Sequence, residues 1–384
     1  MVLKSKTVMY AGVILFAAVM ILGSGTGAGV SLGSTTAHYE NGGLGTGNQA
    51  VNLLGSNMTA KIVAKSGEII TGQVNATGYD FGIYIGPGVT NVLIDHAHVF
   101  GANDQGVIAT DTQNIMVMYS NISGNEVNPN KGIPLTGGIG FYGVSNSYIV
   151  GNTVTYDAAG GIVVANTGRV PTGLPYPQPN MSANNNLIAN NLVEYDANAC
   201  GIVIVAFNAG PGNEVANNFV FNNTVIGSLQ LANGTFTGPF VGTIVVAADL
   251  PGTLVKDTLV VDNYVKGGLE SGILANAQAP FAVNTGTEIV MNTIIMGGFQ
   301  KVNFPPFDNA SDMNLPPSSN AIGIYGNYQP GMPQSPVVSD VSVLYNTIVD
   351  NSIGIWTANS YGDIYIGNTF TNVTTDFASF YGVG

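Results

Sequence analysis

Residues 138–160 read GIGFYGVSNSYIVGNTVTYDAAG, and this stretch decides the fold. It opens with glycine and alternating apolar residues, and a second apolar run follows at Tyr148–Val150. Asn152 then leads a third run, which includes Thr153 and Val154. Short β-branched runs of period two, separated by Gly and Asn, are typical of strands. The stretch therefore predicts three strands and three turns.

The same unit recurs along the chain. A glycine followed by alternating apolar residues begins it at Gly82, Gly106, Gly138, Gly161, Gly201, Gly242, Gly272, Gly323 and Gly354. The shortest repeats, from Gly82 to Gly106 and from Gly138 to Gly161, are 24 and 23 residues long. Coils of this length stacked about 4.8 Å apart pair every strand with the coils above and below it. We therefore predict an all-β solenoid of about nine or ten coils.

An asparagine before the third strand of successive coils predicts a ladder. Asparagine tolerates the left-handed backbone of a tight turn, and its amide bonds its counterparts along a stack. We assign the ladder a structural role and place in it Asn121, Asn152, Asn191, Asn218, Asn263, Asn292, Asn346 and Asn368.

The Gly-Ile/Val opener and the asparagine turn resemble the pectin-lyase-like right-handed parallel β-helix superfamily, which includes secreted archaeal and bacterial repeat proteins. The resemblance runs from about Gly82 to the C-terminus. It implies a right-handed parallel β-helix. It says little about function, because the superfamily holds lyases, hydrolases, epimerases, tailspikes, adhesins and inert surface proteins.

Composition excludes several function classes. Only 8% of the residues are charged, against roughly 25% in ordinary soluble domains, and the net charge is −13 with nine lysines and arginines. A chain without a basic stripe does not bind nucleic acid. Cys200 is the one cysteine, so no intramolecular disulfide forms, and its place before a strand favours a small buried hydrophobe over a catalytic thiol.

The N-terminus is expected to be a targeting segment. Lys4 and Lys6 precede an apolar run over residues 8–22, and a stretch of small residues follows it. This arrangement favours a cleaved signal peptide over a retained anchor within residues 1–32, and it places the protein outside the cytoplasm, secreted or anchored at the cell surface. Residues 33–81 are expected to form a cap or first coil, and residues 82–384 the β-helix. Sequons that permit glycosylation begin at Asn57, Asn75, Asn121, Asn180, Asn222, Asn233, Asn309 and Asn372.

Insertions lengthen many coils at fixed points. One set follows the opening strand, at residues 165–185, 205–212, 246–256, 275–286 and 326–339, and another follows the third strand, at 226–240 and 299–319. Each set is expected to emerge at one corner of the stack, and repeat proteins bind through such loops. Aromatic rings in these loops suit sugar rings, although each ring could instead pin its loop to the stack. The candidate glycan- or partner-binding residues are Tyr176, Phe236, Phe240, Phe281, Phe304, Phe307 and Tyr328.

Acidic residues before opening strands are candidate catalytic groups. Asp80 with Asp104, and Asp157 with Asp196, belong to successive coils, where paired carboxylates could act as glycosidase acid and base or hold a cation such as calcium. The alternative is that these aspartates cap turns through local backbone bonds. The resemblance also implies catalytic motifs that are absent here, and the one arginine, Arg169, lies in an insertion.

A metal site is not expected. His96 and His98 share one face of a predicted strand, but no third ligand is apparent. No cofactor is indicated.

The sequence thus favours a non-catalytic extracellular surface protein, structural or adhesive, that binds glycans or neighbouring subunits through loops at one edge of a β-helix. Homo-oligomers are compatible with this hypothesis, and the membrane is reached only through the N-terminal segment. The alternative is a secreted hydrolase or lyase of a neutral polysaccharide that uses the stacked aspartates.

Overall fold

The computed structural model describes residues 35–39, 49–53, 56–125, 137–155, 157, 160–166, 181–194, 200–227, 242–267, 271–295, 320–327 and 334–380. These residues belong to one compact unit that begins at Thr35. Every element among them is a strand, and they contain no helix that is long and apolar enough to cross a membrane. The apolar run over residues 8–22 lies outside the described residues.

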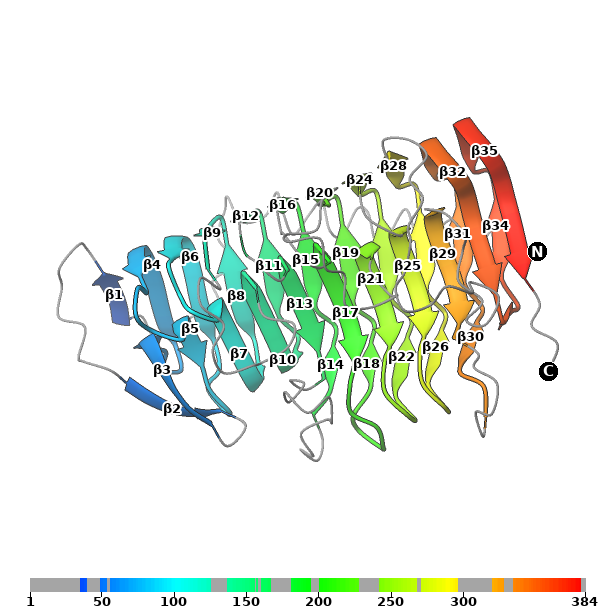
Figure 1. The fold of residues 1–384 in the computed structure, drawn as a ribbon. Helices are drawn as coiled ribbons and strands as arrows, with labels where there is room; N and C mark the ends of the chain where they lie inside the picture. The colour runs from blue at the N-terminus through cyan, green and yellow to red at the C-terminus, as the bar shows by residue number, and fades with distance from the viewer. Residues whose placement is uncertain are drawn as a thin grey trace, which may run out of the picture. The chain divides into compact units, whose positions relative to one another are not determined.

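The strands stack in parallel as successive coils, and the structure confirms the right-handed parallel β-helix (Figure 1). Strands that open each coil pair with one another in sequence order. They are β5 (Phe81–Ile85), β7 (Gln105–Gln113), β10 (Ile139–Ser145), β13 (Ile162–Ala165), β17 (Ile202–Ala206), β21 (Gly242–Ala248), β25 (Ser271–Ala277), β29 (Asn320–Gly326), and the C-terminal halves of β32 (Thr347–Ala358) and β35 (Thr369–Phe380).

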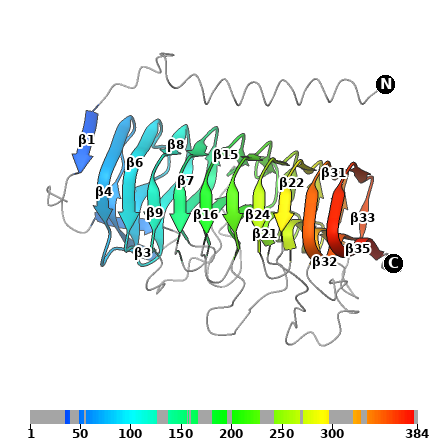
Figure 2. The same cartoon turned by 90° about the horizontal axis from the view of Figure 1, so that it is seen from above.

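Two further columns complete each coil (Figure 2). The second column holds β8 (Ile115–Met118), β11 (Tyr148–Val150), β15 (Leu187–Ala189), β19 (Phe219–Phe221), β23 (Leu259–Val261), β27 (Glu288–Val290), β31 (Ser342–Leu344) and β34 (Ile364–Ile366). The third holds β9 (Asn121–Ser123), β12 (Thr153–Thr155), β16 (Leu192–Glu194), β20 (Thr224–Ile226), β24 (Tyr264–Lys266), β28 (Thr293–Ile295) and the first halves of β32 and β35.

The first coils and one corner have strands of their own. Near the N-terminus, β3 (Ser56–Val63) pairs with β5, β4 (Glu68–Asn75) pairs with β6 (Val92–Phe100), and β1 (Thr35–Tyr39) and β2 (Gln49–Leu53) pair with β4 and β3. A separate six-stranded sheet lies between the opening and second strands. It contains β14 (Ala183–Asn184), β18 (Val215–Ala216), β22 (Leu254–Lys256), β26 (Val283–Thr285), β30 (Val337–Ser339) and β33 (Ser360–Tyr361).

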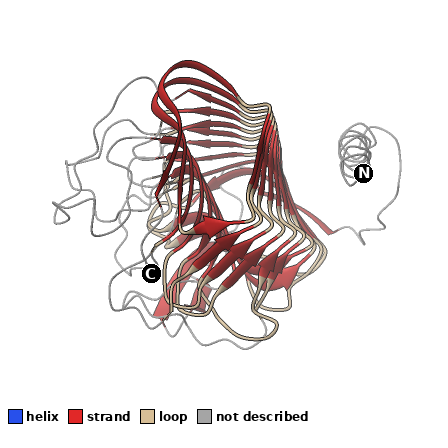
Figure 3. Cartoon of the chain, turned by 90° about the vertical axis from the view of Figure 1, so that its right-hand side faces the viewer, coloured by secondary structure: helices blue, strands red, loops and turns tan. Residues whose placement is uncertain are grey.

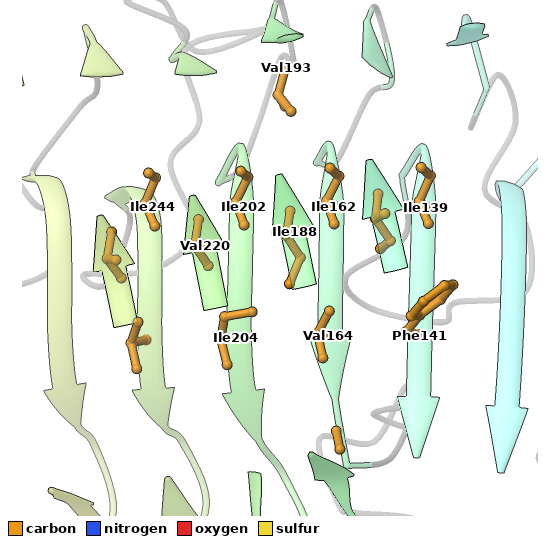
Figure 4. Packing of buried hydrophobic residues seen from close by; sticks show 14 of the residues in the cluster. Ile139, Phe141, Ile162, Val164, Ile188, Val193, Ile202, Ile204, Val220 and Ile244 are labelled. Atoms are coloured by element: carbon orange, nitrogen blue, oxygen red, sulfur yellow. The ribbon is translucent and has the colours of Figure 1, made fainter. Parts of the chain in front are cut away.

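Stacked aliphatic rows fill the interior, which the strand layers enclose (Figure 3). Because the register between opening strands places like residues together, Ile139, Ile162, Ile202 and Ile244 form one row and are completely buried (Figure 4). Burying each such side chain contributes roughly 1.5–3 kcal/mol. β-Branched residues suit this pleated surface. The repeating pattern therefore supplies both the strands and a continuous core.

The outward side of the opening strands is buried as well. Tyr84, Tyr142, Val203, Tyr325 and Trp356 belong to a second apolar cluster on that side, and each is at most 8% exposed. Cys200 joins this cluster as a buried thiol.

An asparagine ladder runs through the corner between the second and third strands. The Oδ1 atom of each member accepts both the backbone N–H and the side-chain Nδ2–H of the member one coil earlier, at 2.9–3.0 Å. The members are Asn152, Asn191, Asn223, Asn263, Asn292, Asn346 and Asn368.

Two of the predicted ladder residues lie elsewhere, and those two assignments are wrong. Asn121 is an exposed residue of β9, and Ser120 takes the ladder position before it. Asn218 stacks on Asn186 in a different corner, before the second strand. The left-handed backbone belongs to the residue that precedes each ladder asparagine, such as Asn190 or Asn222. Ladder asparagines themselves are stabilised by hydrogen bonds rather than selected for positive φ.

Candidate functional site

Grooves lie at the corner that follows the opening strands. There the chain leaves the buried opening strand and turns into the six-stranded sheet. Two grooves in the described part of the chain lie at this corner, with volumes of about 460 and 310 Å³. The second is lined by Asn208, Gly210, Pro211, Gly212, Asn213, Glu214, Gly252 and Leu254.

The larger groove joins parts of four successive coils. Its lining comes from the turn after β5, the end of β7, the end of β10 and the start of β14. Hydroxyl and amide side chains dominate this lining, which consists of Gly88, Thr90, Asp111, Thr112, Gln113, Gly143, Ser145, Asn146, Ser182, Asn184 and Asn185. We call this surface the amide groove.

Backbone geometry holds the polar side chains of the amide groove outward. Asn146 and Asn185 both have left-handed backbones, with φ of 52° and 58°, and Asn185 Nδ2 donates to Asn146 Oδ1 at 3.1 Å. Ser145 Oγ donates to the Ser182 carbonyl at 3.2 Å and accepts the Asn184 N–H at 3.0 Å. These bonds fix neighbouring coils relative to one another, so the groove is a preformed feature of the stack.

The electrostatic character of the amide groove is nearly neutral. Asp111 is the one carboxylate in its lining, and that lining includes no Lys, Arg or His. Burial raises the pKa of the Asp262 and Asp363 carboxyls, but neither residue lines this groove. An uncharged oxygen-rich ligand therefore suits the groove better than a polyanion.

The smaller groove is held by asparagine bonds of its own. Asn166 Oδ1 accepts the N–H groups of Phe207 and Asn208 at 2.8 and 3.1 Å, and Asn213 Oδ1 accepts the Met181 N–H at 2.8 Å. At its rim Lys256 pairs with Glu214 at 2.8 Å.

The candidate catalytic aspartates do not reach a groove. Asp80 and Asp104 occupy the same column, since their neighbours Phe81 and Gln105 are in register, but they are only 6% and 0% exposed. Asp80 accepts the Thr59 N–H and hydroxyl at 2.7 and 3.0 Å. These bonds tie Asp80 to the preceding coil and are not local turn caps.

The second predicted pair is not assembled on the described surface. Asp157 is completely buried and accepts the Asn125 N–H at 2.8 Å, in a corner column apart from Asp80 and Asp104. Asp196 lies outside the described residues.

The histidine pair has no metal-binding partner set. His96 is exposed, has a left-handed backbone and contacts the Asp95 carboxylate at 2.8 Å. Among the described residues, no group of three or more His, Cys, Asp or Glu residues is arranged to hold a metal ion.

Most of the predicted loop aromatics lie outside the described residues: Tyr176, Phe236, Phe240, Phe304, Phe307 and Tyr328. Phe281 is described. It is 49% exposed and lies in the turn between β25 and β26, at the same corner as the grooves.

Four predicted sequon asparagines are exposed on the described surface, as glycosylation requires: Asn75, Asn121, Asn222 and Asn372. The side chain of Asn57, and all of Asn180, Asn233 and Asn309, lie outside the described residues.

The amide groove was not among the sites predicted from the sequence, although Ser182, Asn184 and Asn185 fall at the end of the predicted insertion 165–185. Much of its lining comes from Ser/Asn turns such as Ser145-Asn146 and Asn184-Asn185, just before second strands. Adjacent Ser/Asn pairs recurring at that point of the repeat were the available signal.

The fold and this corner define a β-helix protein with solvent-facing grooves along one edge. No protein-family model matches the sequence, and no match is found among curated proteins. Similar solved structures include PfbA, a surface adhesin of Streptococcus pneumoniae, at 12% identity and a TM-score of 0.39, covering 84% of this chain and 82% of PfbA. A periplasmic alginate epimerase, AlgG, has 12% identity and a TM-score of 0.43, covering 83% of this chain and 70% of that one. An alginate lyase from Paenibacillus has 13% identity and a TM-score of 0.39, covering 81% and 93%. None of these likenesses bears on what this chain binds or catalyses.

Proposed function

We propose that this chain is a non-catalytic extracellular surface protein that binds neutral glycans in the amide groove. The observation that carries the proposal is the lining of that groove, in which hydroxyl and amide groups surround one carboxylate and no cation. Export is inferred from the charged and apolar N-terminal segment.

Chemistry favours a sugar over other ligands. Each sugar hydroxyl both donates and accepts, and Gln, Asn, Ser and Thr side chains offer both functions. A polyuronate would need cations to compensate its charge, and the lining supplies none.

The number of carboxylates in the groove supports binding without hydrolysis. Glycoside hydrolysis normally uses two carboxyl groups about 5–10 Å apart. The lining of the amide groove has Asp111 alone. The hydrolase or lyase alternative would have to use residues elsewhere.

The proposal predicts that Gln113→Ala combined with Asn185→Gly weakens glycan binding at least ~10-fold, because two polar partners of the ligand are lost. Glycine keeps the left-handed backbone of Asn185 accessible. Isothermal titration calorimetry against a panel of neutral oligosaccharides measures the change.

The matched control is Asn222→Gly, which removes an exposed left-handed asparagine at a different corner and should leave binding unchanged. Absence of binding across the panel refutes the proposal. Release of reducing or unsaturated ends from a neutral polysaccharide, lost in Asp111→Asn or Asp104→Asn, would favour the enzyme alternative.

Subunit assembly is a second candidate function, supported by the last described coil. Tyr361, Ile364, Ile366 and Phe377 are 62%, 45%, 39% and 44% exposed. Ile366 continues an outward apolar row that includes Val290 and Leu344. β35 pairs with β32 on one side, and no described strand pairs with its other side. Exposed apolar strand edges associate with other strands, and a second copy of this chain is the partner we propose.

This candidate predicts that Ile364→Lys with Ile366→Lys shifts sedimentation velocity profiles from dimers or larger species to monomers. Thr369→Lys with Thr371→Lys adds the same charge to the neighbouring strand of that coil and should leave association intact. Monomers throughout the accessible concentration range for the unsubstituted protein would contradict assembly through this coil.

A further inference from the structure

The last coil leaves the hydrophobic interior open at the C-terminal end of the stack. This coil spans residues 360–380 and contains β33, β34 and β35. Its residues Tyr365, Phe370 and Phe377 pair with interior residues of the preceding coil. Phe377 is nevertheless 44% exposed, and its ring centroid lies 5.0 Å from that of Tyr365 in an edge-to-face contact. The interior therefore ends in aromatic side chains that solvent can reach.

The N-terminal end of the same interior is closed. There β1 pairs with β4, and β2 pairs antiparallel with β3, so these two strands cover edges of the first coil. Ile62, Ile70 and Val74 of that coil belong to the interior and are at most 5% exposed. The closed end lies opposite β35 in the stack (Figure 1). In the described part of the chain, the two ends of the interior are thus different.

The backbone edges of the last coil are open as well. β33, β34 and β35 pair with β30, β31 and β32 on one side, and no described strand pairs with their other side. At about 3.3 Å per residue, this edge is roughly 70 Å long, and a sheet layer about 10 Å thick gives an end surface of roughly 700 Å². A standard protein interface buries about 800 Å² per partner. The end surface is therefore large enough for a stable dimer.

We propose that two copies of this chain associate through their C-terminal ends, related by a two-fold axis, and that protonation of carboxylates at these ends strengthens the dimer. This inference rests on the subunit assembly proposed above and specifies its geometry. A two-fold axis places the same surface on both copies and runs the two open edges antiparallel, which is the more stable pairing of strands. It also removes Phe377 of both copies from water. Because the N-terminal ends are closed, assembly stops at two copies.

The charge of the C-terminal end makes this association depend on pH. Residues 334–380 contain four aspartates and no Lys, Arg, His or Glu. The four are Asp340, Asp350, Asp363 and Asp376. Asp350 accepts a hydrogen bond from Asn372 of β35 at 2.7 Å, and Asp376 lies in β35 itself. A two-fold dimer brings two such acidic ends together without a compensating cation.

Asp363 is the aspartate most affected by its surroundings. Its carboxylate accepts the Val341 N–H and the Tyr365 hydroxyl, both at 3.0 Å. Burial raises the pKa of the Asp363 carboxyl, and the neighbouring Asp340 carboxylate raises it further, although the hydrogen bonds act in the opposite direction. Carboxylates brought together in the dimer hold protons more tightly than in the monomer. Association therefore takes up protons and tightens as the pH falls from neutrality towards the pKa of Asp363.

Analytical ultracentrifugation over a concentration series tests the dimer. The average mass should rise to twice that of the monomer and stop there. Ile364→Asp with Ile366→Asp should weaken association at least ~10-fold, because it adds like charges to an apolar rim. Met116→Asp with Met118→Asp is the matched control, since these residues occupy the corresponding outward positions of β8. The control should leave the affinity unchanged.

A mixing experiment separates the geometry from assembly itself. A tagged Ile364→Asp/Ile366→Asp variant should not retain the untagged, unsubstituted protein in a pull-down, because its C-terminal end no longer associates. Retention would mean that its N-terminal end binds the C-terminal end of another copy, which overturns the two-fold arrangement but keeps assembly. Monomers at every concentration of the unsubstituted protein, or unchanged association in the variant, would refute assembly through this coil altogether.

The pH dependence has its own test. The dissociation constant of the dimer should be at least ~5-fold lower near pH 4.5 than near pH 7. Asp363→Asn with Asp376→Asn should bind tightly at both pH values, because the repelling charges are gone. Equal affinity of the unsubstituted protein at the two pH values, or an undiminished pH dependence in the amide variant, would overturn the role of these carboxylates.

Discussion

Replacing Asn263 by leucine is expected to lower the free energy of unfolding by about 4 kcal/mol. Asn263 Oδ1 accepts the Asn223 N–H and Nδ2–H, both at 2.9 Å, and its Nδ2 donates to the Val220 carbonyl and to Asn292 Oδ1. Leucine has similar volume but leaves these buried groups without partners. Guanidinium unfolding followed by far-ultraviolet circular dichroism measures the loss.

Asn222 provides the control one position before a ladder residue. Its side chain is exposed and donates to Asn190 Oδ1 at 2.7 Å. Asn222→Gly keeps the left-handed backbone and should change stability by no more than about 0.5 kcal/mol. If the two substitutions lower the free energy of unfolding equally, the ladder is not what stabilises this corner.

Gly82→Ala is expected to destabilise the chain by more than about 3 kcal/mol. A Cβ atom at Gly82 would lie 2.4 Å from the Gly106 carbonyl oxygen and 2.4 Å from Val99 Cγ1. The backbone of the next coil cannot yield without breaking strand pairing. Thermal and guanidinium unfolding should both report the loss.

The comparison is Gly78→Ala. Gly78 has φ of +86° and nothing within 4 Å of an added Cβ, so alanine there meets only the strain of a left-handed backbone, about 1–2 kcal/mol. An equal or larger loss at Gly78 would show that turn conformation, rather than close approach of coils, explains the glycine at the start of the repeat.

The sequence was sufficient for the fold because the repeat is local. Gly138 marks the start of a strand at a point where the backbone of the next coil approaches closely, and the alternating residues after it specify that strand. The isoleucines of successive coils specify an interior row. Each coil repeats the same information, so an error in one coil did not alter the predicted architecture.

The ladder was only partly predictable, because its membership depends on register. Asn217-Asn218 and Asn222-Asn223 lie in the same coil, and either pair could lead a strand in the linear pattern. Strand pairing puts Asn223 on Asn191 and Asn218 on Asn186. A shift of one residue moves a side chain from the inside of a corner to its surface, which is how Asn121 was misassigned.

The candidate catalytic aspartates, like the ladder, were only partly predictable from the sequence. Their recurrence before opening strands was visible in the sequence, but burial was not, and Asp104 and Asp157 prove to be completely enclosed. A carboxylate without access to solvent cannot contact a polysaccharide chain.

The sequence by itself determined the strand period, the coil length and the aliphatic interior, because these are properties of neighbouring residues. Tertiary structure alone decided which side chains share a surface. Thr90, Gln113, Asn146 and Asn185 are far apart along the chain and meet only through the stacking of coils. The spacing between coils along the sequence varies with each insertion, whereas hydrogen bonding between strands fixes their spacing in space, so the groove exists only in the assembled solenoid.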